Sequence, residues 1–268
     1  MSKHRSINFA RILTIVVIGG CAGFLSGLFG VGGGMIIVPA LMIILDMPQR
    51  QAAATSLCAI IITAATGSIM YATQGNVSIN AMLLVSLGAL IGAQIGVWLL
   101  RILPEWLLPW IFVTFILSII VIQQFHEPLR ASRIHVTALS AFGMIAVGVV
   151  SGIFAGLVGV GGGGIIVPGL ELVVGAGDLI ARGTSLLAMI PTALSGTFTS
   201  FRYGLVDLRV GLFVGAIASA ITPVGMWVAQ SISPETGNIL FSVFLVFVCV
   251  STVMKARRRM RKHSQEAN

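Results

Sequence analysis

The sequence predicts an all-α integral membrane protein with about eight transmembrane helices in two homologous four-helix repeats. Hydrophobic residues make up 57% of the 268 residues and charged residues only 9%, whereas a soluble domain carries about 25% charged residues. Apolar runs of about 20 residues, the length that spans a bilayer as a helix, recur along the chain. The second half also matches the first at a constant offset of 129 residues.

Eight apolar runs are long enough to cross a membrane. They lie at about 12–29, 52–73, 79–102, 106–124, 136–158, 183–202, 208–230 and 237–254. We expect helices, because a segment in lipid must bond its own backbone groups and these runs lack the alternation of a barrel strand. The chain then divides into a first transmembrane repeat (1–125), a basic linker (126–135), a second transmembrane repeat (136–254) and a basic tail (255–268).

The duplication is clearest at a glycine-rich break after the first helix of each half. Gly30, Gly32, Gly33 and Gly34 correspond to Gly159, Gly161, Gly162 and Gly163, and Ile36-Ile37-Val38-Pro39 corresponds to Ile165-Ile166-Val167-Pro168. A short apolar run follows each break, at 35–45 and 165–174. Such a run reaches about 15 Å as a helix, half of a hydrocarbon core. We therefore predict a half-length helix there, either re-entrant or a broken continuation of the preceding helix.

The distribution of basic residues predicts the orientation. Lys and Arg gather before the first helix, in the linker and in the tail, and such residues favour the cytoplasmic side. If all three segments are cytoplasmic, each half has four spans and the two halves share one orientation. If the short run crosses fully, each half has five spans, the halves are inverted and the linker lies outside. We rank the inverted arrangement second.

Glycines at four-residue steps recur in three of the predicted helices. They are Gly19, Gly23 and Gly27; Gly88, Gly92 and Gly96; and Gly148, Gly152 and Gly156. Small faces of this kind let helices pack closely in lipid. We assign them packing and no chemistry.

The glycine-rich breaks are the strongest candidates for a binding site. Glycines let backbone N–H groups approach a ligand, and a helix that begins just after them presents unpaired donors and the positive end of its dipole. Together these features suit an anion, and paired broken helices in two repeats are typical of transporter substrate sites. The candidate residues are Gly32, Gly33, Gly34, Gly161, Gly162, Gly163 and Gly164. The alternative is that these glycines serve helix crossing alone.

Two Thr-Ser pairs stand at the start of the next predicted helix in each half. They are Thr55-Ser56 and Thr184-Ser185. As N-cap residues they would satisfy free backbone donors. Their hydroxyl groups could equally bind an oxyanion, so we include them in the candidate substrate site.

Glu171 is an acid inside an apolar run, and its counterpart in the first half is Met42. An ionisable residue within a membrane segment is a functional hypothesis by default, and we assign Glu171 to proton coupling. The alternative is that it lies at a loop edge and reaches water. Arg182 and Arg202 lie at helix ends, and we interpret both as interfacial anchors that could also attract an anion.

Several classes of chemistry are not expected. The net charge of +8 comes from clusters at helix ends, which favours lipid headgroups over nucleic acid as the partner. His4, His126, His135 and His263 avoid the apolar runs, and the three cysteines are far apart, so we predict no metal site and no cofactor. The sequence lacks a Gly-Lys pair and a Gly-x-Ser-x-Gly motif, so neither a P-loop nor a hydrolase elbow is expected.

With these motifs in place, the chain resembles the sulfite exporter TauE/SafE family of membrane permeases. The resemblance rests on the segment from Gly27 to Pro39 with Thr55-Ser56, and on its copy from Gly156 to Pro168 with Thr184-Ser185. It covers about residues 12–254 and implies a secondary transporter in the cytoplasmic (inner) membrane of a prokaryote. The resemblance also implies a cargo such as sulfite, sulfonates or other small organosulfur anions.

We therefore predict a multi-pass permease for small anions, not an enzyme, with both termini cytoplasmic. Its partners would be a small anionic solute and membrane lipids, and a homo-oligomer remains open. The alternatives are a passive anion channel, or a membrane-embedded enzyme or interaction protein without transport activity. The absence of a histidine, a cysteine pair or a carboxylate pair within the predicted spans disfavours an enzyme.

Overall fold

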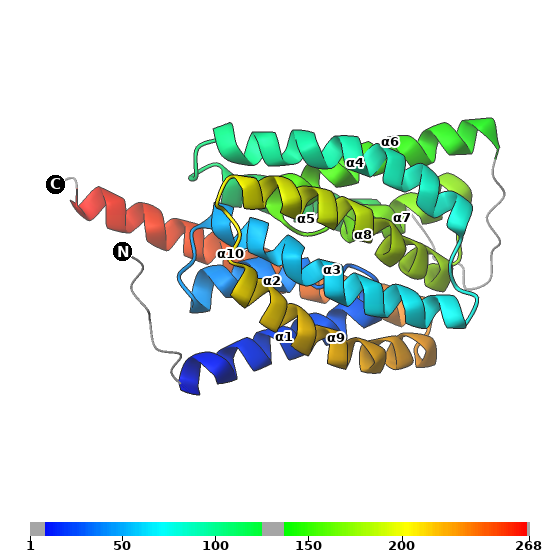
Figure 1. Ribbon diagram of the computed structural model, residues 1–268, viewed down its shortest axis with the longest axis horizontal. Coiled ribbons are helices and arrows are strands. Elements are labelled where there is room, and N and C mark those ends of the chain that lie inside the picture. The colour runs from blue at the N-terminus through cyan, green and yellow to red at the C-terminus, as the bar shows by residue number, and fades with distance from the viewer. Residues whose placement is uncertain (1–8, 125–136, 267–268) are drawn as a thin grey trace.

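The protein is entirely helical over the residues that the computed structural model describes, 9–124 and 137–266, with side chains described for 15–121 and 137–254. The first half contains α1 (Phe9–Phe29), α2 (Gly34–Ile44), α3 (Gln49–Thr73), α4 (Ile79–Ile102) and α5 (Leu108–Gln124). The second contains α6 (Ala138–Val158), α7 (Gly163–Val174), α8 (Asp178–Arg202), α9 (Leu208–Ser231) and α10 (Pro234–Glu266). Figure 1 shows the long helices running along one elongated bundle, with the end of α10 projecting from it.

Six helices are long and apolar enough to cross a bilayer. They are α3, α4, α6, α8, α9 and the 234–254 part of α10. The apolar stretches with described side chains in α1 (Ile15–Phe29) and α5 (Leu108–Val121) are shorter. The all-helical membrane class is thus confirmed, while the number of eight spans stays a prediction.

Large apolar side chains lie on the outside of the bundle. Trp98, Phe213, Trp227 and Phe247 are all more than half exposed, and Trp227 is 69% exposed. Soluble monomers rarely expose contiguous apolar surface of this kind. Lipid chains would solvate these side chains, which agrees with the composition.

Both predicted half-length helices are present, and each folds back along its preceding helix. α2 has 11 residues and α7 has 12. A Cβ built on Gly33 would lie 2.8 Å from the Ala22 carbonyl oxygen, and one on Gly162 would lie 3.0 Å from the Ser151 carbonyl oxygen. Ile37 also packs in one apolar cluster with Ala22. The chain therefore turns back at each glycine-rich break, as a re-entrant segment does.

The order of contacts along two neighbouring helices gives their relative direction: the helices are parallel when the residue numbers of the contacting pairs rise together on both. On α1 and α9, Gly19 lies near Ile217 and Gly27 near Thr222, so these helices are parallel. The same test makes α3 parallel to α9 and α4 parallel to both α6 and α8. On α3 and α8, Gly67 lies near Leu186 while Leu57 lies near Gly196, so these helices are antiparallel. It follows that α1 and α6, which begin the two halves, run in opposite directions.

The helix directions do not agree with four-plus-four halves in one orientation. α1 begins and α10 ends at one end of the bundle, which we call the terminal end. α5 ends and α6 begins at the opposite end, which we call the linker end (Figure 1). The physical reason is that α1 and the short helix folded back on it return the chain to the end from which it came, so that α3, α4 and α5 carry the first half to the opposite end. The predicted linker, 126–135, itself lies outside the described residues.

The glycine stripes bring helix backbones into contact, as predicted. A Cβ on Gly88 or Gly92 of α4 would lie 2.1 Å from a carbonyl oxygen of α6. One on Gly148 of α6 would lie 2.1 Å from a carbonyl oxygen of α4, and Gly23 meets α9 in the same way. A side chain at these positions would overlap backbone, so glycine is needed for the observed spacing.

Backbone features recur at the 129-residue offset. The residue pairs with positive φ at both members are Gly30 and Gly159, Gly32 and Gly161, Gly33 and Gly162, Asp46 and Gly175, and Gly75 and Gly204. The contact of α1 with α9 is likewise matched by that of α6 with α4. Such pairing is what an internal duplication predicts.

Candidate functional site

The two glycine-rich breaks meet inside the bundle. We call 30–33 the first glycine turn and 159–162 the second glycine turn. A Cβ on Gly34 would lie 2.8 Å from the Gly159 carbonyl oxygen, and one on Gly163 would lie 2.6 Å from the Cα of Val31. All residues from 30 to 35 and from 159 to 164 are buried. The structure therefore brings the seven predicted glycines together, although they come from opposite halves.

A glycine with positive φ precedes the first residue of the short helix at both turns. Gly33 and Gly162 precede α2 and α7 with φ values of 77° and 85°, a left-handed conformation that strains any residue with a side chain. No side chain caps either helix. The first N–H groups of both helices, and the positive ends of their dipoles, therefore converge where the turns meet.

Met189 lies between the two turns. A Cβ on Gly32 would be 2.4 Å from the Met189 methyl carbon, and one on Gly161 would be 2.3 Å from the same atom. Ile60 lies against both glycines as well. Ile60 and Met189 are each close to the midpoints of α3 and α8, so the turns meet about halfway along the bundle. No motif in the sequence distinguishes either residue.

The two predicted serines each bind the glycine turn of the other half. Ser56 donates a hydrogen bond to the Gly159 carbonyl oxygen, and Ser185 donates one of 3.2 Å to the Gly30 carbonyl oxygen. Both hydroxyl protons are therefore directed at the backbone. The serines adjoin the predicted site, and in this conformation they stabilise the backbone of the glycine turns.

The interpretation of the Thr-Ser pairs as N-caps is wrong. α3 begins at Gln49 and α8 at Asp178, so both pairs lie within their helices. Thr55 accepts a hydrogen bond of 3.0 Å from the backbone N–H of Asp207, and Thr184 accepts one of 2.9 Å from that of Ser78. Asp207 and Ser78 are the N-cap residues of α9 and α4. Each threonine thus secures a helix start in the other half.

Glu171 is buried beside two further charged residues. Its side chain is in α7, and the residue is 6% exposed, so it does not lie at a solvated loop edge. Arg182 and Asp178 of α8 are 4% and 1% exposed. Arg182 Nη2 lies 3.5 Å from Asp178 Oδ2, whereas neither Asp178 oxygen has a hydrogen bond within the described residues. We take this contact as an ion pair without hydrogen-bond geometry.

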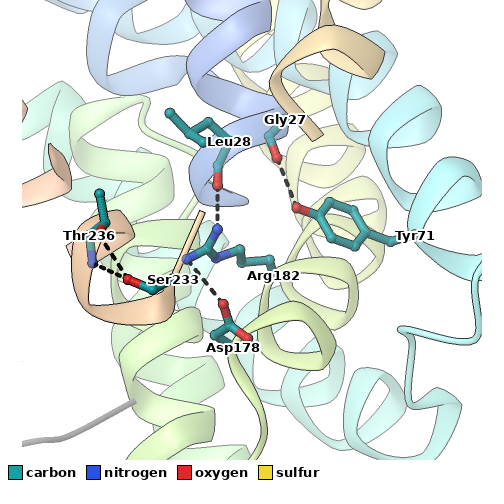
Figure 2. Close-up of polar contacts among 7 residues, drawn as sticks. All are labelled: Gly27, Leu28, Tyr71, Asp178, Arg182, Ser233 and Thr236. Atoms are coloured by element: carbon teal, nitrogen blue, oxygen red, sulfur yellow. Dashed lines mark hydrogen bonds and ion pairs between the residues drawn. The ribbon is translucent and has the colours of Figure 1, made fainter. Parts of the chain in front are cut away.

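Arg182 is not an interfacial anchor, because its side chain turns inward. Figure 2 shows the guanidinium group between Asp178 and the end of α1. Arg182 Nη1 donates a hydrogen bond of 2.7 Å to the Leu28 carbonyl oxygen, and Tyr71 donates one of 2.9 Å to that of Gly27. A cation is favourable at the negative end of a helix. Arg202, in contrast, is exposed above the ring of Phe198, as an anchor would be.

Other predicted features fall partly outside the described residues. The four histidines and the side chains of the basic tail are among them. Among the described side chains no cluster of His, Cys, Asp or Glu could hold a metal ion. The three cysteines are not joined to one another.

Comparison with known families assigns the chain. The family described as sulfite exporter TauE/SafE matches residues 15–170 and 144–268. The chain belongs to the sulfite exporter TauE/SafE family. It is therefore a member of a membrane transporter family, and the two glycine turns occupy the centre of a TauE/SafE protein.

Relatives of the chain are named probable membrane transporter proteins. The probable membrane transporter protein YdhB of Bacillus subtilis is 24% identical over 78% of this chain and 87% of its own length. A probable membrane transporter protein of Haemophilus influenzae is 26% identical over 92% of this chain and 100% of its own. One from Methanocaldococcus jannaschii is 24% identical over 86% and 91%. No solved structure matches the chain.

Proposed function

We propose that this TauE/SafE protein is a secondary carrier of small anions and that it binds them between the two glycine turns. The observation that carries the proposal is the convergence of two uncapped helix starts in the buried centre of the bundle. Each dipole end contributes up to about 2 kcal/mol when partly buried, and hydrogen bonds to a charged group contribute about 1.5–3 kcal/mol each. A few such bonds hold a small anion without an arginine in the site, and still allow release.

The cargo that best suits this site is a small tetrahedral or pyramidal oxyanion. Sulfite, sulfonates and related organosulfur anions have this form, with several oxygens that can accept from backbone N–H groups at once. The family description names sulfite, which supports this class of cargo. The burial of both turns around Met189 favours a carrier that must change shape over a channel that stays open.

We further propose that the two halves are inverted repeats in the cytoplasmic membrane of a prokaryote. The opposite directions of α1 and α6 support this arrangement. We assign each of the 16 Lys and Arg residues to the end of the bundle at which the nearest helix begins or ends. By this criterion the linker end has only three of them, Arg130, Arg133 and Arg182. The other residues adjoin the terminal end. Since basic residues favour the cytoplasm, both termini are cytoplasmic and the linker is outside.

Reconstitution into liposomes tests the proposed site. The purified chain should accelerate the flux of sulfite or a small sulfonate, and Gly33→Val and Gly162→Val should abolish that flux. Gly20→Val is the matched control, because a Cβ at Gly20 meets nothing within 4 Å. Thermal stabilisation by the transported anion should be present in the control and absent in the two site variants. Normal flux in both site variants would show that the turns serve helix packing alone.

A further inference from the structure

Three charged residues of the second half have no counterpart in the first. Glu171, Asp178 and Arg182, which we call the charged trio, are each less than 10% exposed. The 129-residue offset places uncharged residues at the corresponding positions, Met42, Gln49 and Ala53. The glycine turns and serines around them are paired between the halves. A charged group present in one half only therefore confers a property that differs between the two ends of the protein.

The charged trio lies close to the linker end. Glu171 is three residues before the end of α7, and Arg182 is four residues after the start of α8. Glu171, Arg182 and the first turns of α10 line a cavity of about 10 Å³, which holds roughly one water molecule. One helical turn is about 5.4 Å, so this cavity lies about one turn below the linker-end surface.

Towards the terminal end, apolar and buried groups close the same cavity. Phe29 and Phe241 line it and belong to one apolar cluster with Leu157 and Leu245. The described parts of α5 and α6, which also pack against α7, contain no Asp, Glu, Lys, Arg or His. Asn238 of α10 also lines the cavity, whereas Glu235, one turn earlier in α10, is exposed. Among the described residues, the charged groups beside Glu171 are thus Arg182, which lines the same cavity, and Asp178, which pairs with Arg182.

A continuous set of contacts joins the charged trio to the first glycine turn. Arg182 binds the Leu28 carbonyl oxygen, two residues before that turn (Figure 2). A Cβ on Gly30 would lie 2.7 Å from the Cα of Arg182. Ser185, one turn further along α8, binds the Gly30 carbonyl oxygen. Movement of the guanidinium group would therefore release the end of α1 and the turn that follows it.

We propose that the charged trio is a proton-binding gate that exchanges protons with the solution at the linker end and controls access to the glycine turns from that side. This inference rests on the transport function proposed above. Glu171 binds one proton from water, and the charge of the trio changes from −1 to 0. When Glu171 is neutral, Arg182 keeps its hydrogen bond to the Leu28 carbonyl oxygen and the gate is closed. Ionised Glu171 competes for the guanidinium group and opens the gate.

Thiol labelling tests the gate without requiring flux. Asn238→Cys, in a full-length chain whose native cysteines are replaced, places a thiol in the cavity. A membrane-impermeant thiol reagent added at the linker side should label it several-fold faster at high pH than at low pH, after correction for thiolate content. Glu171→Gln should remove this difference. Ser233→Cys, exposed at the same end of α10, is the control and should label at one corrected rate throughout.

Flux measurements then separate the gate from the site. In vesicles of known orientation, the flux of methanesulfonate, an anion that does not titrate in this pH range, should follow the pH of the linker side. Glu171→Gln should abolish that dependence while Glu235→Gln retains it. Arg182→Lys keeps the charge but loses the planar fork, so it should shift the pH profile. A labelling rate that is independent of pH, or a pH dependence that survives in Glu171→Gln, would overturn the gate. Absence of flux with intact pH-dependent labelling would instead count against transport.

Discussion

Ser56 and Ser185 hold each other's halves together: the hydroxyl of each donates to a carbonyl oxygen of the glycine turn in the other half. Both side chains are fully buried. The two turns are therefore fixed from opposite sides by equivalent bonds. Neither half therefore holds the turns alone, which suits the carrier proposed above.

Replacing these serines should weaken the centre of the protein. Ser56→Ala and Ser185→Ala each leave a buried carbonyl oxygen without its partner, which costs about 1–3 kcal/mol. We expect a lower melting temperature in detergent and reduced flux for both variants. Ser118→Ala removes an exposed hydroxyl that, among the described residues, donates to the Phe115 carbonyl oxygen of its own helix, so it should have little effect. Equal stability of all three variants would contradict the bracing role.

Helix packing gives an independent prediction for α4 and α6. Gly92→Val places a side chain where a Cβ already lies 2.1 Å from the Val149 carbonyl oxygen. The helices must separate, so we expect a large loss of thermal stability and little folded protein in the membrane. Gly20→Val serves as the control, because its site is open. Unchanged yield and melting temperature for Gly92→Val would mean that α4 and α6 are not in contact.

Much of the fold could be predicted from the sequence because the signals are local. The length of the apolar runs predicts the helices, and the glycine stripes predict which helix faces pack closely. The orientation of the halves could not be predicted in the same way. It depends on whether the first helix of each half crosses the bilayer, or ends at the glycine turn and is carried back by the short helix, and the lengths and compositions of these segments permit either outcome.

The candidate site was predicted in part. Glycine spacing and the repeat identified both turns, but not that Gly34 would meet Gly159. The Thr-Ser pairs are placed at helix starts by the sequence because the true starts, at Gln49 and Asp178, carry weak local signals. Arg182 was interpreted as an anchor because its distance from a helix end cannot show that its side chain turns inward. The signal that could have identified the charged trio is that its three residues correspond to uncharged residues in the first half.

Topology can be tested directly. Against the arrangement that the basic clusters alone favour, we now expect the linker outside and both termini inside. In a chain without native cysteines, Ser132→Cys should react with an impermeant thiol reagent in intact cells. Ser2→Cys and Ser264→Cys should react only after permeabilisation. Labelling of all three positions on the same side would refute inverted halves.

Met189 should set the size of anion that the site accepts. Its methyl group lies against Gly32 and Gly161, where the two helix starts converge, and a methionine side chain can move aside readily. Met189→Ala removes the group that fills this space. We expect larger sulfonates to gain flux relative to sulfite. Competition between sulfite and alkyl sulfonates of increasing length would measure this change.

The control for Met189 must separate selectivity from stability. A buried Met→Ala change costs about 2–5 kcal/mol wherever it is made, so a general loss of flux would carry no information. Met144 is also fully buried, in the same apolar cluster, and it is not among the residues nearest to the glycines of either turn. Met144→Ala should therefore lower the melting temperature by a similar amount and leave the ratio of sulfonate to sulfite flux unchanged. If the two variants give the same ratio, Met189 fills the centre of the protein without selecting its cargo.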